Sequence, residues 1–122
     1  MSRRQIEITN MTLGTVLAAA AEVADNPWTR FVGLLGRAGL RPGEGLQILP
    51  CKSVHCWFMR FTIDVVYLDR DGRVVKTVPR LRPFCYSWGG RRAHSVLELP
   101  ADTIAATQTA VGDKLAFSEV SR

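Results

Sequence analysis

Four side chains in the middle of the chain are of types that could do chemistry together. They are His55, Met59, Arg60 and Asp64. Asp64 stands in an apolar run, where a buried carboxylate needs a partner, and a hairpin or bend would bring His55 or Arg60 to it. One interpretation is a polar cluster at the mouth of a pocket, in which Asp64 orients His55 or Arg60. The other, which we prefer, is a buried hydrogen-bonded network that fixes strand register.

A second candidate site is the segment 79–92, which is rich in arginine and aromatic residues. It contains Arg80, Arg82, Phe84, Tyr86, Trp88, Arg91 and Arg92. Such side chains together bind phosphates or carboxylates and stack on bases or sugar rings, and they are frequent at protein–protein hot spots. We predict a long loop over 79–90, and such loops are often functional. The alternative is a surface loop with solvated arginines and with aromatic rings that cover a sheet edge.

Cysteine and histidine residues suggest two weaker sites. Zinc prefers tetrahedral sets of these residues, and one could be drawn from Cys51, His55, Cys56, Cys85 and His94. The spacing of Cys51 and His55 fits, but no second short-spaced pair accompanies it, so we predict no metal and no cofactor. For nucleophilic catalysis, Cys56 and His55 are neighbours and point to opposite faces of a strand. Lys52 could favour the thiolate of Cys51, but no residue is placed to orient a base.

Composition and charge exclude several classes of protein. The 122 residues, 47% of them hydrophobic, are typical of one globular domain, which we place at 1–122. We find no membrane-spanning run and no signal-peptide region, and the odd number of cysteines suits a reducing compartment. We therefore expect a cytoplasmic protein, provided that no leader was removed. Positive charge gathers in residues 73–92, which indicates a local anion site or a solvated loop and no nucleic-acid signature.

The elements that must position these residues are mostly short strands. The segment 16–24 fits either a helix or a buried strand. We predict helices over 28–35, capped by Asn26 and ended by Gly36, and over 103–110, capped by Asp102. Strands are predicted over 5–9, 46–49, 54–61, 63–68, 73–78, 95–99 and 114–117. With no regular βαβ rhythm, this pattern predicts a mainly β, single-domain fold, either a β-sandwich or a partly closed barrel with two short helices at its edges.

The run 50–69 resembles the signature of a known family. It has a His, then aromatic residues and a Met with a basic residue, then an Ile-Asp-hydrophobic strand that leads into an Asp-Gly hairpin. The flanking segments 30–35, 96–101 and 111–113 agree. The chain thus resembles, over about residues 16–117, the bacterial and archaeal family named domain of unknown function 192. The resemblance implies a mainly β, sandwich-like fold and no particular activity. Cys56 and Thr62 depart from it, since Ser or Thr and Pro are more usual at these positions.

Two functions from different classes fit these observations. We prefer a non-catalytic binding module for an anionic or sugar-like ligand or a partner protein, because no acid, base and nucleophile are visible at workable spacing. The alternative is a hydrolase or metal-assisted enzyme that uses His55 and Asp64, with Cys51 assisting. The candidate binding residues are His55, Met59, Arg60, Asp64, Arg80, Arg82, Tyr86 and Trp88.

Overall fold

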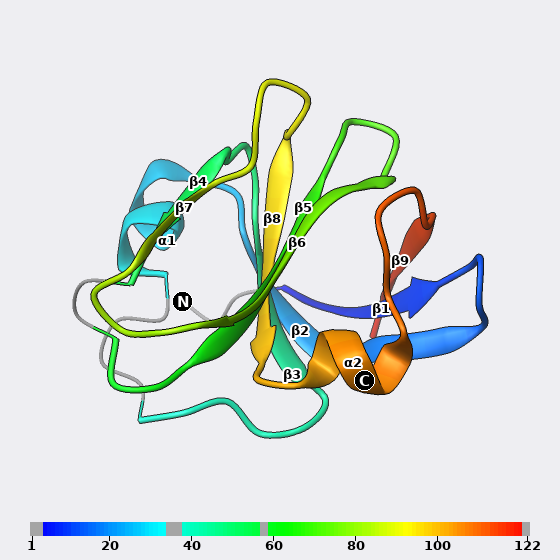
Figure 1. Cartoon of the computed structure of the whole chain (residues 1–122), viewed down its shortest axis with the longest axis horizontal. Helices are drawn as coiled ribbons and strands as arrows, with labels where there is room; N and C mark the ends of the chain where they lie inside the picture. Colours follow the sequence, from blue (N-terminus) through cyan, green and yellow to red (C-terminus); the bar gives the residue numbers. More distant parts are fainter. Residues whose placement is uncertain (1–3, 34–37, 57–58, 121–122) are drawn as a thin grey trace.

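The structure is a computed structural model that describes residues 4–33, 38–56 and 59–120. The helices in these ranges are α1 (Pro27–Val32) and α2 (Thr103–Thr107), and neither is long and apolar enough to cross a membrane. The strands, shown in Figure 1, are β1 (Gln5–Asn10), β2 (Thr15–Ala24), β3 (Glu44–Ile48), β4 (Ser53–His55), β5 (Ile63–Leu68), β6 (Val74–Leu81), β7 (Tyr86–Trp88), β8 (Ser95–Pro100) and β9 (Leu115–Glu119). The fold is therefore mainly β, as predicted.

A large sheet carries most of the strands and curls into a half-barrel. Its strand order is β6-β5-β8-β3-β2-β1-β9, and only β2 and β3 run parallel. The two edge strands approach each other at one end of the curl, where Arg73 bridges to Lys114 and the Val74 N–H donates to the Asp113 carbonyl at 2.9 Å. Of the two predicted architectures, the partly closed barrel is the one observed.

The inside of the curl holds the first of two hydrophobic cores. Its buried members are Ile6, Ile8, Leu17, Ala18, Ala21, Val23, Val66, Leu68, Val74, Leu97, Leu99, Ile104 and Leu115. Ile104 comes from α2, which lies below the strands in Figure 1 and closes this core at one end. Because aliphatic side chains fill the curl, its interior is a packed core.

A second, two-stranded sheet of β4 and β7 covers the outer face of the main sheet. Val54 on β4 joins a second core with Ile63, Val65 and Tyr67 of β5. Strand β5 is consequently buried on both faces, since its alternate residues Val66 and Leu68 point into the curl. This sandwiched position explains why β5 has no polar residue except Asp64.

Tyr67 attaches the small sheet to the large one. Its hydroxyl donates to the Ser87 carbonyl at 3.0 Å and lies 3.1 Å from the Ser87 hydroxyl. Burial raises the pKa of Tyr67 to about 12, so the phenol stays a neutral donor. The ring packs so closely on Gly89 that an added Cβ there would overlap it. A glycine is therefore required where the chain leaves β7.

Several predicted elements are confirmed and one ambiguity is resolved. The segment 16–24 forms β2, whose small residues Ala18 and Ala21 fit the crowded interior of the curl. Helix α1 begins at Asn26, whose side chain accepts from the Thr29 N–H at 2.9 Å in a capping box. It ends at Val32 with Gly33 as its C-cap, short of the predicted end at residue 35, and the predicted stop at Gly36 lies outside the described residues. Asp71-Gly72 forms the predicted turn between β5 and β6.

Other predicted elements are wrong in extent. The expected strand over 54–61 is observed as the three residues Ser53–His55, which pair with β7 and not with β5. Half of the expected long loop over 79–90 is β-structure, because β6 continues to Leu81 and β7 spans Tyr86–Trp88. Helix α2 ends at Thr107, short of the predicted Ala110. These pairings depend on residues far away in sequence, which local patterns do not encode.

Candidate functional site

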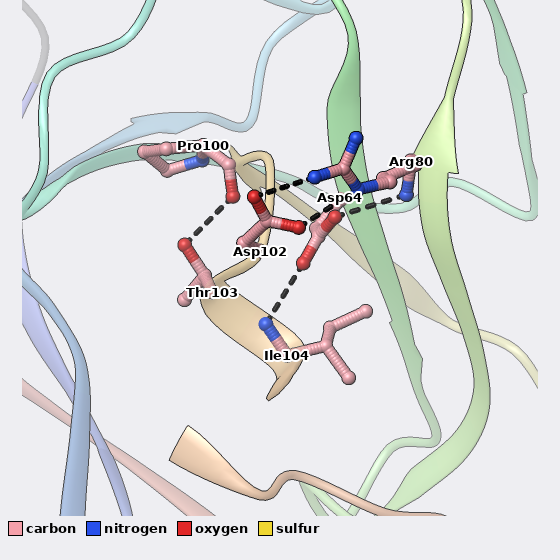
Figure 2. Close-up of polar contacts among 6 residues, drawn as sticks. All are labelled: Asp64, Arg80, Pro100, Asp102, Thr103 and Ile104. Carbon is pink, nitrogen blue, oxygen red and sulfur yellow. Dashed lines mark hydrogen bonds and ion pairs between the residues drawn. The ribbon is translucent and has the colours of Figure 1, made fainter. Parts of the chain in front are cut away.

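Several of the predicted site residues lie in two separate regions on opposite sides of β5. The Asp64 network consists of Asp64, Arg80, Asp102 and Ile104, at the start of α2 (Figure 2). The aromatic face consists of His55, Tyr86 and Trp88, on the outer surface of the β4–β7 sheet. Buried hydrogen bonds hold the Asp64 network together, whereas strand alternation exposes the side chains of the aromatic face.

Asp64 is fully buried and both of its oxygens are occupied by backbone donors. One oxygen accepts from the Arg80 N–H at 3.0 Å and the other from the Ile104 N–H at 2.8 Å. The Ile104 N–H belongs to the first turn of α2, whose N–H groups have no partner within the helix. Asp64 thus caps this helix from a strand 40 residues away in sequence. This arrangement agrees with the interpretation that Asp64 belongs to a buried structural network.

Arg80 meets Asp64 through a β-bulge. The register of β5 and β6 shifts between Ile63 and Val65, so that Pro79 and Arg80 lie opposite the single residue Asp64. Proline has no N–H to donate, and Arg80 adopts a positive φ of 53°. The bulge leaves the Arg80 N–H without a partner on the neighbouring strand. The positive φ directs this N–H to the Asp64 carboxylate, which accepts it instead.

The Arg80 side chain is used in the same network. Its guanidinium donates to both oxygens of Asp102 at 2.8 and 2.9 Å, and both side chains are largely exposed. Asp102 stands at the predicted N-cap position of α2, but its side chain makes no capping hydrogen bond. The predicted capping role of Asp102 is therefore wrong, since Asp64 performs it. Within the described residues, Arg80 binds an acidic neighbour and does not face the aromatic side chains of β7.

The aromatic face is created by strand alternation. In β7 the middle residue Ser87 is buried against Tyr67, so Tyr86 and Trp88 must point outward. Their side chains are 55% and 52% exposed. His55 lies opposite Tyr86 in the antiparallel pair, and the two ring centroids are 4.8 Å apart. Phe84, in the turn before β7, is 76% exposed.

Basic side chains border the aromatic face. Lys76 on β6 donates from Nζ to the Trp88 carbonyl at 2.8 Å. Arg82 is exposed in the turn that precedes β7, where its carbonyl accepts from the Cys85 N–H. Large aromatic residues exposed together on a small sheet are uncommon on a surface that has no binding role. The face therefore combines flat apolar area with positive charge at its edge.

The remaining predicted site residues do not join either region. Met59 is buried in the outer core, and Arg60 is exposed in the connection to β5. The predicted pairing of Asp64 with His55 or Arg60 is not observed: Val54 packs on the outer face of β5, and Asp64 lies on the same side as Val66, inside the curl. The sheet thus separates His55 from Asp64. The two could not act together on one substrate.

The cysteines have the environment of structural residues. Burial, together with the nearby Glu98 and Cys85, raises the pKa of the Cys56 thiol to about 12. Burial also raises the pKa of Cys51, whose Sγ donates to the Ser53 carbonyl at 3.0 Å. Raised values disfavour the nucleophilic thiolate, so the suggested activation of Cys51 by Lys52 is not supported. Among the residues that the structure describes, no three His, Cys, Asp or Glu side chains are grouped so as to hold a metal ion.

Sequence comparisons establish the family. The family model DUF192, described as uncharacterized ACR, matches residues 8–117. The chain belongs to the DUF192 family. Among archaeal relatives, a UPF0127 protein of Pyrococcus furiosus is 33% identical over 117 residues, which is 91% of this chain and 97% of that protein. A UPF0127 protein of Thermococcus sibiricus is 31% identical over 87% of this chain and 71% of its own.

A solved structure shares the fold of this DUF192 chain. It is a crystal structure of a protein of unknown function from Novosphingobium aromaticivorans, with a TM-score of 0.78 and 19% identity. The match covers 92% of this chain and 83% of the other. At this identity the likeness concerns the fold alone. It shows that the curled half-barrel also occurs in a solved protein.

Some residues of both regions were not apparent from the sequence. The partner of Arg80, Asp102, and the Ile104 N–H that completes the Asp64 network lie more than 20 residues from the groups they bind. Lys76 belongs to the predicted basic segment 73–92, but nothing in the sequence places it beside the aromatic residues. Tyr86 and Trp88 are predicted site residues, and their spacing of two residues shows that they share a face once β7 is recognised as a strand.

Proposed function

We propose that this protein is a non-catalytic binding module whose aromatic face binds sugar-like ligands. The observation that carries the proposal is that Tyr86 and Trp88 both point outward from the same side of β7, where each is about half exposed. Two aromatic rings two residues apart on a strand offer successive flat surfaces, on which ring-shaped ligands stack by dispersion and by burial of apolar area. The Tyr67 anchor keeps this surface in place before a ligand arrives, which lowers the entropy cost of binding.

The charge around the face indicates which sugars bind best. The Lys76 ammonium donates to the Trp88 carbonyl, and the exposed Arg82 lies in the turn that leads into β7. Cations at the rim of an interface attract anionic ligands and increase their association rate. We therefore expect acidic saccharides, which carry carboxylates, to bind more tightly than neutral ones of the same length.

The enzyme alternative has less support. It requires His55 and Asp64 to act on one substrate, but the main sheet separates them and both Asp64 oxygens accept backbone hydrogen bonds. A carboxylate that is fully buried and already occupied is a poor general base. The raised pKa values of Cys51 and Cys56 also remove the thiolate that would assist.

A titration with matched saccharides tests the proposal. We would titrate hexagalacturonate, which is acidic, and maltohexaose, which is neutral, into the full chain and measure binding by calorimetry. We expect the acidic hexamer to bind more tightly. Trp88→Ala should weaken both by on the order of tenfold, as expected for the loss of one stacking ring. Arg82→Gln should weaken only the acidic hexamer.

Controls separate loss of binding from loss of fold. Met11 is 62% exposed in the turn between β1 and β2, so Met11→Ala removes exposed apolar area away from the face and should leave binding unchanged. Circular dichroism and thermal melting should show each variant folded. If neither hexamer binds, or if Trp88→Ala binds as the wild type does, the saccharide proposal is wrong. In the first case, a protein partner becomes the better interpretation of the face.

A further inference from the structure

A charged cavity lies beside the small sheet, apart from both regions described above. Its volume is about 460 Å³. One wall is the turn between β5 and β6 and the other is the connection from β7 to β8, and Figure 1 shows these two loops at the same end of the molecule. The charged residues that line the cavity are Lys52, Asp69, Arg70, Asp71, Arg91 and Arg92. Four cations therefore face two carboxylates.

The β5–β6 turn forms a rigid first wall. Oδ1 of Asp69 accepts from the N–H groups of Asp71 at 2.9 Å and Arg73 at 3.0 Å, which fixes the turn from within. Partial burial opposes ionisation of Asp69, but these two hydrogen bonds and the positive charges of Arg92 and Lys114 together hold its pKa below the usual value. Asp69 is therefore a charged structural group whose Oδ1 is already occupied.

The second wall is attached to the first by backbone hydrogen bonds. The His94 N–H donates to the Leu68 carbonyl at 2.7 Å, and the His94 carbonyl accepts from the Cys51 N–H at 2.8 Å. Lys52 then reaches across and donates from Nζ to the Arg91 carbonyl at 3.1 Å. The cations are thus presented by segments that are fixed relative to one another.

The cavity carries a net positive charge, since its four cations face only two carboxylates. Arg92 makes a long ion pair with Asp69, at 4.0 Å between the nearest nitrogen and oxygen. Within the described part of the chain, the guanidinium groups of Arg70 and Arg91 have no hydrogen bond or ion pair, and Lys52 binds only a neutral carbonyl. Cations held close together repel one another unless an anion lies between them. The arrangement is therefore suited to an anion that several donors can share.

We propose that this cavity binds a phosphate group carried by a small molecule as a monoester. Arginine guanidinium groups bind phosphate oxygens with paired, charge-assisted hydrogen bonds. A phosphate offers three terminal oxygens, so donors from both walls can each take one, whereas a carboxylate offers two. Cavities of several hundred cubic ångströms hold small-molecule ligands, and the space here exceeds that of a lone phosphate. This inference does not depend on the aromatic face.

Calorimetric titration at constant ionic strength tests the assignment. The ligands are inorganic phosphate, glucose 6-phosphate and, as the uncharged reference, glucose. We expect both phosphate compounds to bind, with glucose 6-phosphate the tighter, and glucose to give no heat from this site. Arg91→Gln and Arg70→Gln should each reduce the affinity by about tenfold or more, the loss expected for a hydrogen bond to a charged group. Arg41→Gln, which removes an exposed arginine elsewhere, should have no effect.

Backbone amide NMR shifts provide the second measurement. With phosphate binding in the cavity, the shifts concentrate on the residues around Lys52 and 91–94, and Trp88→Ala leaves the phosphate affinity unchanged. If Arg41→Gln lowers the affinity as much as Arg91→Gln does, the effect is unspecific attraction to a basic protein, and the assignment is wrong. It is equally wrong if phosphate does not bind at all. Neither result bears on saccharide binding, which Trp88→Ala tests separately.

Discussion

The Asp64 network and the aromatic face differ in how far the fold itself accounts for their residues. In the network, Asp64 is fully buried and each of its oxygens accepts a backbone N–H. On the face, Tyr86 and Trp88 expose about half of their surface. A polar group whose bonding capacity is filled inside the fold is accounted for by stability alone. Exposed aromatic area costs free energy in water, and it is this area that calls for a functional explanation.

Removing the Asp64 carboxylate should have the largest effect and should affect stability alone. Asp64→Ala leaves the buried N–H groups of Arg80 and Ile104 without acceptors, and we expect a loss of about 3 kcal/mol or more in the free energy of unfolding. Urea denaturation followed by circular dichroism measures it. Asp102→Ala removes a largely exposed partner of Arg80 and should cost less than about 1 kcal/mol.

The contrast between the two aspartates is itself a test. Should Asp64→Ala unfold at the wild-type urea concentration, or should Asp102→Ala prove the more harmful variant, Asp64 would not be the residue that caps α2. The Asp64 network would then not be what stabilises this part of the fold.

Gly89→Ala should disturb the aromatic face through the fold that supports it. The added methyl group would overlap the Tyr67 ring, so β7 must move, and overpacking of this kind costs about 2 kcal/mol. Binding at Trp88 should weaken together with stability, because the face is displaced. Gly39→Ala is the matched control, since a Cβ at Gly39 meets no atom within 4 Å. Thermal melting and saccharide titration of both variants would show whether the two effects are coupled. If Gly89→Ala melts as Gly39→Ala does, Tyr67 does not anchor the small sheet.

The smallest effect concerns Asp69 and depends on pH. Because its folded pKa lies below the ordinary 3.8, ionised Asp69 stabilises the folded state above that value, and the contribution is lost as pH falls through the folded pKa. Asp69→Asn should therefore lower stability slightly at neutral pH and make little difference at strongly acidic pH. Urea titrations across this range measure the convergence. A difference that grows on acidification would have the wrong sign for this account.

Local sequence patterns were sufficient to predict the elements whose structure depends mainly on neighbouring residues. Alternation and β-branched residues predicted the strand character of β5 and β8, and Asn26-Pro27 marked the start of α1. The choice between helix and strand for β2 depended on its neighbours. Its alanines favour a helix in isolation, but pairing with β1 and β3 decides the outcome. Tertiary contacts override propensity here.

Long-range pairing explains why the sites were only partly predictable. A carboxylate in an apolar strand indicated that Asp64 belongs to a buried network. The sequence does not show that its two oxygens accept from the N–H groups of Arg80 and Ile104. The aromatic residues at 84–88 were noticed, yet the interpretation as one long loop obscured the alternation that exposes Tyr86 and Trp88 and buries Ser87. The basic segment 73–92, which includes Arg91 and Arg92, indicated a local anion site or a solvated loop. The sequence did not show that Lys52 and the turn between β5 and β6 join it, because these segments come together only when β4 and β7 cover β5.

The central claim is that the outward side of the β4–β7 sheet binds a ligand while the Asp64 network only holds the fold. An NMR titration of the full chain with hexagalacturonate tests both halves at once. The account predicts shifts of the amides of Tyr86–Trp88 and Ser53–His55 that saturate with added ligand, and unchanged amides at Arg80 and Ile104. Saturating shifts at Arg80 and Ile104, with Tyr86 and Trp88 unaffected, would contradict it.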